Sequence, residues 1–125
     1  DGVTKFALAR YDTDGALDTS FNTTGIVITE IQYEAKIYSL LIQSDDKIVV
    51  GGYSYGDLAT QFALARYNAN GSIDTAFGSN GITLTTIGGH NSESIIRSIT
   101  IQSNGDIIAA GHSNLSFAVA RYLGA

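Results

Sequence analysis

Bulky and small residues alternate along a six-residue string that occurs three times in the chain. The string Phe-Ala-Leu-Ala-Arg-Tyr occupies residues 6–11 and 62–67, and Phe-Ala-Val-Ala-Arg-Tyr occupies residues 117–122. This alternation predicts a β-strand that carries Phe, Leu or Val, and Arg on one face and the two Ala and Tyr on the other. Because both faces are mainly apolar, we expect other sheets to cover the strand on both sides.

Further strands are predicted between these strings, and each has two copies. β-Branched runs predict one strand at residues 25–31 and 81–87. Two apolar runs joined by a short polar turn predict a hairpin, at residues 37–43 and 47–53 and again at residues 95–102 and 106–111. The repeating unit is therefore predicted to contain four antiparallel strands and no helix.

A unit of four short antiparallel strands with glycine-rich turns is typical of a β-propeller blade, which packs face to face on the next blade around an axis. A β-sandwich is the alternative, but it would not repeat its sequence. We predict an all-β, β-propeller-type fold with about two four-stranded blades per chain. The domain is expected to span residues 1–125, with repeat units at 6–61 and 62–116 and a partial third unit at 117–125.

The predicted strands do not close a ring. The chain holds one surplus copy of the Phe-to-Tyr strand and fewer than the roughly four to eight blades of a closed propeller, so apolar blade faces would be exposed at both ends. Either a longer parent chain carries more repeats, or chains associate and exchange strands. We expect a homo-oligomer, with a trimer of six blades favoured over a tetramer of eight.

Composition and charge narrow the possible partners. Apolar residues make up 44% of the chain and charged residues only 15%, so disorder is excluded and much of the surface is expected to be buried on neighbours. The absence of Cys excludes disulfides and thiolate metal sites. With a net charge of −5 there is no basic stripe for nucleic acid, and no apolar run or amphipathic helix predicts membrane insertion.

Several strings resemble a known family. The segments at residues 42–53, 62–68, 70–78 and 81–86 are similar to delta-sixty (delta-60) repeats, which are bacterial repeats of about sixty residues, and the hairpins resemble the strand pair that opens NHL-type blades. The resemblance covers nearly the whole chain. It implies a propeller in a bacterial secreted or cell-surface protein with an undefined binding function, and it carries over no catalytic residue.

Two repeated polar motifs are interpreted as structural. The tetrad Asp12–Gly15 resembles the start of a calcium loop, but its second copy, Asn68–Gly71, lacks the charge, so we favour an Asx turn. Arg10, Arg66 and Arg121 recur, and so do Asp18 and Asp74 in an Asp-Thr motif. The arginines could form an anion site in each blade, but identical residues in every unit favour an Arg that binds Asp or backbone carbonyls within or between blades.

The residues that differ between repeats are the better candidates for function. Residues 32–36 and 88–94 are connections of unequal length, and so are residues 54–60 and 113–115. In an antiparallel meander these connections emerge on one rim of the propeller, where insertions in repeat proteins commonly form a binding face. The candidate ligand-binding residues are Tyr33, Tyr53, Tyr55, Asp57, His90, Asn91, His112 and Asn114.

Tyr together with Asn, Asp and His is a mixture suited to sugars. We therefore predict a non-enzymatic binding or adhesion module of a bacterial surface or fibre protein, extracellular, that recognises a glycan or protein ligand through this rim and needs no cofactor. A purely structural oligomerisation or spacer domain is the alternative. A propeller hydrolase with a metal on His90 and His112 is a third hypothesis, disfavoured because no nucleophile elbow or phosphate loop is present.

Overall fold

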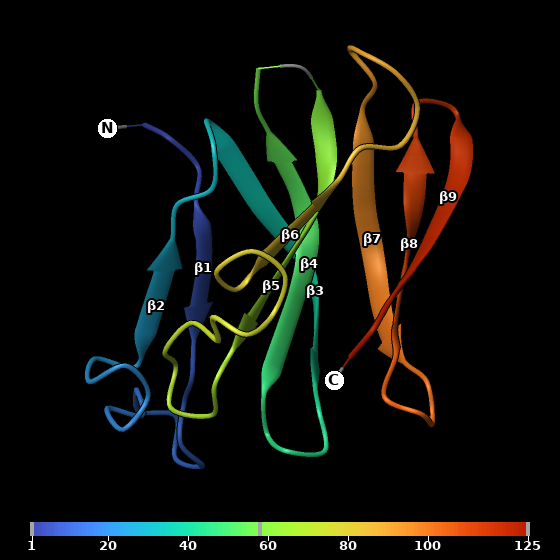
Figure 1. Cartoon of the computed structure of the whole chain (residues 1–125). Coiled ribbons are helices and arrows are strands. Elements are labelled where there is room, and N and C mark those ends of the chain that lie inside the picture. Colours follow the sequence, from blue (N-terminus) through green and yellow to red (C-terminus); the bar gives the residue numbers. More distant parts are fainter. Residues whose placement is uncertain (1, 58, 125) are drawn as a thin grey trace.

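The computed structural model describes residues 2–57 and 59–124, which form nine β-strands in three antiparallel sheets stacked face to face (Figure 1). This part of the chain contains four strands in the middle sheet and no helix, so the predicted all-β unit is confirmed. The first sheet contains β1 (Phe6–Ala9) and β2 (Ile26–Thr29); the middle sheet contains β3 (Glu34–Ile42), β4 (Ile48–Tyr55), β5 (Thr60–Tyr67) and β6 (Ile82–Thr85); the last sheet contains β7 (Ser94–Ile101), β8 (Ile107–Ser113) and β9 (Ser116–Tyr122).

The hairpin strands extend further than predicted toward the end of the sheets where the connections of unequal length lie. Tyr55 pairs with Glu34 on one side and with Thr60 on the other, so β3, β4 and β5 take in residues that the sequence placed in connections. In contrast, β2 and β6 are shorter than their β-branched runs. The extension follows from cross-strand pairing, which continues as long as the neighbouring strand offers a partner.

The middle sheet is covered on both faces, as the alternation in its Phe-to-Tyr strand predicts. Ala63, Ala65 and Tyr67 of β5 pack against the first sheet, and Phe62 and Leu64 pack against the last sheet. All five side chains are fully buried. The bulky face of each Phe-to-Tyr strand thus meets the small face of the next sheet.

The same strand is covered on only one side at each end of the stack. In β1, Phe6 is buried against the middle sheet whereas Ala7 and Ala9 on the opposite face are exposed. In β9 the exposure is reversed, because Ala118 is buried while Phe117 and Val119 are 99% and 67% exposed. The two outer faces of the stack are therefore different surfaces: one presents small residues and the other bulky ones.

A polar clasp ties each sheet to the following one. The Nε atom of Arg66 donates to Asp74 Oδ2 at 2.8 Å, its Nη1 atom donates to the Gly124 carbonyl at 2.7 Å, and the guanidinium lies 4.7 Å from the centre of the Phe77 ring. In the preceding repeat Arg10 makes the same contacts, with Asp18 Oδ2 at 2.8 Å, the Ala69 carbonyl at 2.7 Å and the Phe21 ring at 4.6 Å. The structural interpretation of the repeated arginines is therefore confirmed for Arg10 and Arg66.

The Asp-rich and Asn-rich tetrads are turns. The side chain of Asp12 accepts a hydrogen bond from the Ala16 N–H, and that of Asn70 accepts one from the Ser72 N–H. Across the described residues, no three His, Cys, Asp or Glu side chains lie close enough together to hold a metal ion. No helix in this part of the chain is long and apolar enough to cross a membrane.

Replacing Arg66 by Met is expected to lower the free energy of unfolding by about 3 kcal/mol, because it leaves the buried Asp74 carboxylate and the Gly124 carbonyl without this donor. Urea denaturation followed by circular dichroism measures the change. Arg10→Met is the matched control and should cost clearly less, since the Arg10–Asp18 pair is partly exposed. Equal losses in the two variants would contradict this account of the clasp.

Low pH is expected to reduce the stability of the fold by protonating Asp74. The hydrogen bond from Lys47 Nζ, aided by the Ala76 N–H and Arg66, outweighs burial and holds the pKa of Asp74 below its usual value of 3.8. A carboxyl whose pKa is lower in the folded state stabilises the fold above its unfolded pKa and loses this effect as pH falls through the folded value. The free energy of unfolding is therefore expected to fall below about pH 4. Asp74→Asn should flatten that slope; an unchanged slope would show that Asp74 does not contribute.

Candidate binding site on the variable rim

The connections that differ between repeats lie together at one end of the stack. The links β2–β3, β4–β5, β6–β7 and β8–β9 all emerge at the top of Figure 1, and the remaining turns emerge at the bottom. Antiparallel pairing within every sheet produces this separation, because successive connections alternate between the two ends. We refer to the end that carries these four links as the variable rim.

A polar pocket of about 220 Å³ lies on the variable rim, between the middle and last sheets. It brings together three of the predicted residues, Tyr55, Asp57 and Asn91, from two connections that are far apart in the sequence. Its lining residues are Tyr55, Gly56, Asp57, Ala59 and Thr60 from the β4–β5 link, and Asn91, Ser92 and Glu93 from the segment before β7.

Backbone hydrogen bonds hold the walls of the pocket in place. The Thr60 N–H donates to the Ser92 carbonyl at 3.0 Å, and the same segment forms a parallel bridge between Thr60 and Glu93. Asn114 fixes Glu93 from the other side, because its N–H donates to the Glu93 carbonyl at 2.7 Å and its Oδ1 accepts from the Glu93 N–H at 3.0 Å. Asn114 therefore positions the pocket without lining it.

Two tyrosines stand beside the pocket. The rings of Tyr33 and Tyr55 are tilted by 57° with centroids 6.4 Å apart, and the two side chains are 58% and 50% exposed. The Tyr33 hydroxyl donates to Asp57 Oδ1, and this hydrogen bond, together with the carboxylate charge, raises the pKa of Tyr33. The pair therefore presents two accessible aromatic rings next to a carboxylate.

The floor of the pocket contains an unsatisfied hydroxyl. Ser92 is buried, with 4% of its surface exposed, and its Oγ has no hydrogen-bond partner among the described residues. A buried hydroxyl that lacks a partner costs roughly 1–3 kcal/mol. Because this oxygen is enclosed by the surrounding chain, its cost belongs to the fold and a ligand in the pocket does not reach it.

Besides Tyr33 and Asn114, which stand next to the pocket, the other three predicted residues also lie outside its lining. Tyr53 is buried, donates its hydroxyl to Glu34 Oε1 at 2.5 Å and stacks on Tyr38, so it differs from the expected rim contact and acts in packing. Burial and this hydrogen bond raise the pKa of Tyr53 above the ordinary range for tyrosine. His90 is exposed on the β6–β7 link, and His112 lies within β8, opposite Phe117. Neither histidine lines the pocket.

Thr60 and Ser92 line the pocket but are not among the residues that the sequence predicts. The pattern places Thr60 in a connection, and nothing in it distinguishes Ser92 from the other serine of its segment. The contact between the two connections depends on how the sheets stack. That stacking brings residues together across more than thirty positions, and no local periodicity reports it.

Asp57→Asn should lower the pKa of Tyr33 toward the usual tyrosine value of 10.0, because it removes the carboxylate that stabilises the protonated phenol. Carbon-13 NMR of labelled tyrosine rings across a pH titration measures this, with Tyr33→Phe assigning the signal. Asp45→Asn is the control, because Asp45 lies in the β3–β4 turn at the other end of the stack. An unchanged Tyr33 titration in Asp57→Asn would contradict the pairing.

Comparison with known proteins agrees with the geometry. Residues 1–21 and 43–77 match a family model described as "Domain of unknown function (DUF5122) beta-propeller". A comparison with curated proteins finds no match. The matched segments contain β1, β4 and β5 and the first part of the connectors that follow β1 and β5. The chain is thus similar to a β-propeller family, and its fold is an all-β, β-propeller-type repeat whose sheets do not close into a ring.

Proposed function

We propose that this chain is a non-enzymatic recognition module, built from delta-sixty-like blades, that binds a glycan in the variable-rim pocket. The observation that carries the proposal is the gathering of Tyr33, Tyr55 and Asp57 next to Asn91 and Glu93 around one polar hollow. The location at a bacterial surface or in a fibre is supported by the resemblance to delta-sixty repeats.

The chemistry of the pocket suits a sugar. An exposed tyrosine ring packs against the C–H face of a pyranose, and short carboxylate and amide groups bind its hydroxyls. Asp57 and Glu93 can each accept two such hydrogen bonds, and Asn91 can both donate and accept. Both connections that line the pocket therefore offer groups that a polyol can use.

The size of the pocket limits the ligand. Its volume of about 220 Å³ is below the roughly 300–1,000 Å³ of sites that enclose drug-sized molecules. One sugar unit, such as the end of a glycan chain, matches this size better than an extended peptide does. We therefore favour a terminal sugar over a protein ligand.

A glycan array probed with the labelled chain tests the proposal. Tyr55→Ala and Asp57→Asn should each weaken binding to the selected glycan by at least about tenfold, because each removes a direct contact. The melting temperature should stay unchanged, since Tyr55 is half exposed. Tyr38→Ala and Asp45→Asn, which alter the same residue types outside the pocket, are the matched controls.

Two results would overturn this function. A silent array would favour the structural alternative, and equal binding by Tyr55→Ala and the unchanged chain would move any sugar site away from this pocket. Incubation with the selected glycan followed by product analysis covers the hydrolase alternative, because a cleaved product would show that the module is an enzyme.

A further inference from the structure

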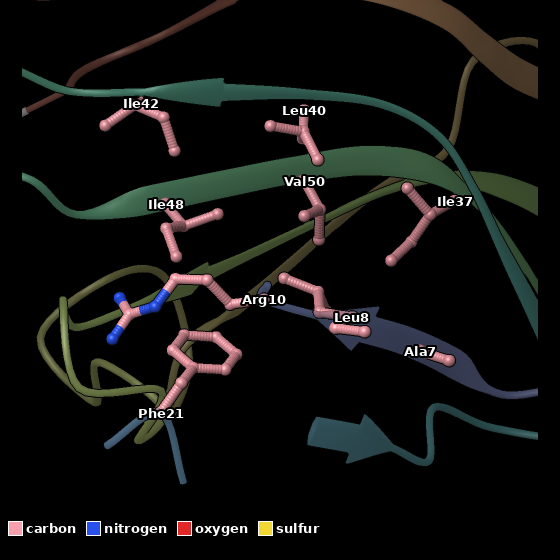
Figure 2. Close-up of a pocket in the computed structure, with 10 residues that line it drawn as sticks. Ala7, Leu8, Arg10, Phe21, Ile37, Leu40, Ile42, Ile48 and Val50 are labelled. Carbon is pink, nitrogen blue, oxygen red and sulfur yellow. The ribbon is translucent and has the colours of Figure 1, made fainter. Parts of the chain in front are cut away.

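An apolar groove lies beside the first sheet (Figure 2). It has a volume of about 280 Å³, with β1 and Phe21 on one side and the β3–β4 hairpin on the other. Figure 2 shows Leu40 and Ile42 of β3 and Ile48 and Val50 of β4 turned toward Leu8 of β1. Leu40 and Ile42 are 56% and 53% exposed, so a large apolar wall of the middle sheet is uncovered there.

The edge of β1 that borders this groove is unpaired. β1 pairs with β2 along its other edge, and no second strand partner occurs among the described residues. The equivalent strands β5 and β9 carry β4 and β8 on the corresponding edge. An open edge inside an apolar groove is a site for an added strand.

The last two sheets show what covers such a wall. In the registers of the two hairpins, the β7–β8 residues Ile99, Ile107 and Ala109 correspond to Leu40, Ile48 and Val50. Strand β7 packs on β3 and β4, and its Ile99 shares one apolar cluster with Leu41 and Val49. By the same arrangement, another hairpin should cover the wall at Leu40. One hairpin could therefore both pair with the open edge of β1 and cover the apolar wall at Leu40.

We propose that the β7–β8 hairpin of a second copy of this chain fills the groove and pairs with β1. The β3–β4 hairpin is enclosed between two sheets, whereas β7–β8 lies at an end of the stack. The pairing of β8 with β9 sets the register, in which Ala109 lies opposite Ala120 and Gly111 opposite Ala118. In the seam, Ala109 of the second copy lies opposite Ala9, and its Gly111 lies opposite Ala7.

In the proposed seam, β1 takes the place of β9 next to β8 of the second copy. The residues of β1 are equivalent to those of β9 that they replace. In the single chain Tyr122 Oη and Thr85 Oγ1 share a hydrogen bond of 2.6 Å, and Tyr11 occupies the same position in β1. Arg66 donates to the Gly124 carbonyl, and Thr13 is the equivalent residue after β1. Since β1 replaces what β9 supplied, burial of Leu40 and Ile42 is the net gain.

The contact is head to tail. Each copy contributes the eight strands β1–β8, which make one blade of its own and half of each of two shared blades, so three copies close a six-bladed ring. Light scattering should therefore give a mass well above the 13.2 kDa of one chain. A mass of one chain at all concentrations would overturn the proposal and favour a hairpin from a preceding repeat of a longer chain as the occupant of the groove.

Cysteine pairing tests the register, because the chain has no cysteine of its own. Ala9→Cys chains mixed with Ala109→Cys chains under mild oxidation should form a disulfide between two chains. Ala7→Cys with Ala109→Cys is shifted by two residues and should not. Equal cross-linking in both mixtures, or none in either while the two variants keep the wild-type melting temperature, would overturn the seam.

Two charged substitutions separate strand exchange from simple stacking of the outer faces. Leu40→Glu places a charge in the groove and should reduce the assembly to single chains, with little change in melting because the side chain is already exposed. Val119→Glu alters the exposed face of β9, which takes no part in the seam, and should leave the mass unchanged. The opposite pattern would overturn strand exchange and favour stacking.

Discussion

The structure depends on one packing contact, between the bulky face of a Phe-to-Tyr strand and the small face of the next sheet. Phe6 and Leu8 meet a surface that contains Ala63 and Ala65, and one repeat later Phe62 and Leu64 meet a surface that contains Ala118. Large residues fit against small ones, which allows close packing without voids. The contact has a direction, because the two faces of each sheet differ, and the stack can therefore be extended at either end by the same contact.

Polar side chains reinforce this contact where a donor in one sheet faces an acceptor in the next. Arg10 and Arg66 each bind an Asp of their own repeat and a carbonyl of the next, so one side chain joins two sheets. Close approach of the hairpin strands needs glycine at one point: a Cβ on Gly52 would lie 1.8 Å from the Lys36 carbonyl oxygen, next to the bulge in β3. The residues that repeat most faithfully thus serve the stack, and the proposed ligand site is built from residues that do not repeat.

The residues that do not repeat lie mainly on the variable rim. Its two facing connections are joined by backbone hydrogen bonds and by Asn114, which gives variable side chains a fixed geometry. Binding residues on loops that a rigid scaffold holds are a common arrangement in repeat proteins. The rim pocket and the apolar groove also differ in chemistry: one is lined by hydroxyl, amide and carboxylate groups and the other mainly by aliphatic side chains, which is why the first suits a polyol and the second a strand.

The sequence by itself determined the local order of this protein. Alternation in the Phe-to-Tyr strings and the β-branched runs specify strands, and recurrence of the same string specifies equivalent sheets, because both depend on residues close together in the chain. Tertiary structure alone decided which side chains meet. It buried Tyr53 against Glu34, placed Tyr55 and Asn91 in one pocket, and left the edge of β1 open beside Leu40. These outcomes depend on how whole sheets stack and where the stack ends, and that information is carried by contacts between distant residues.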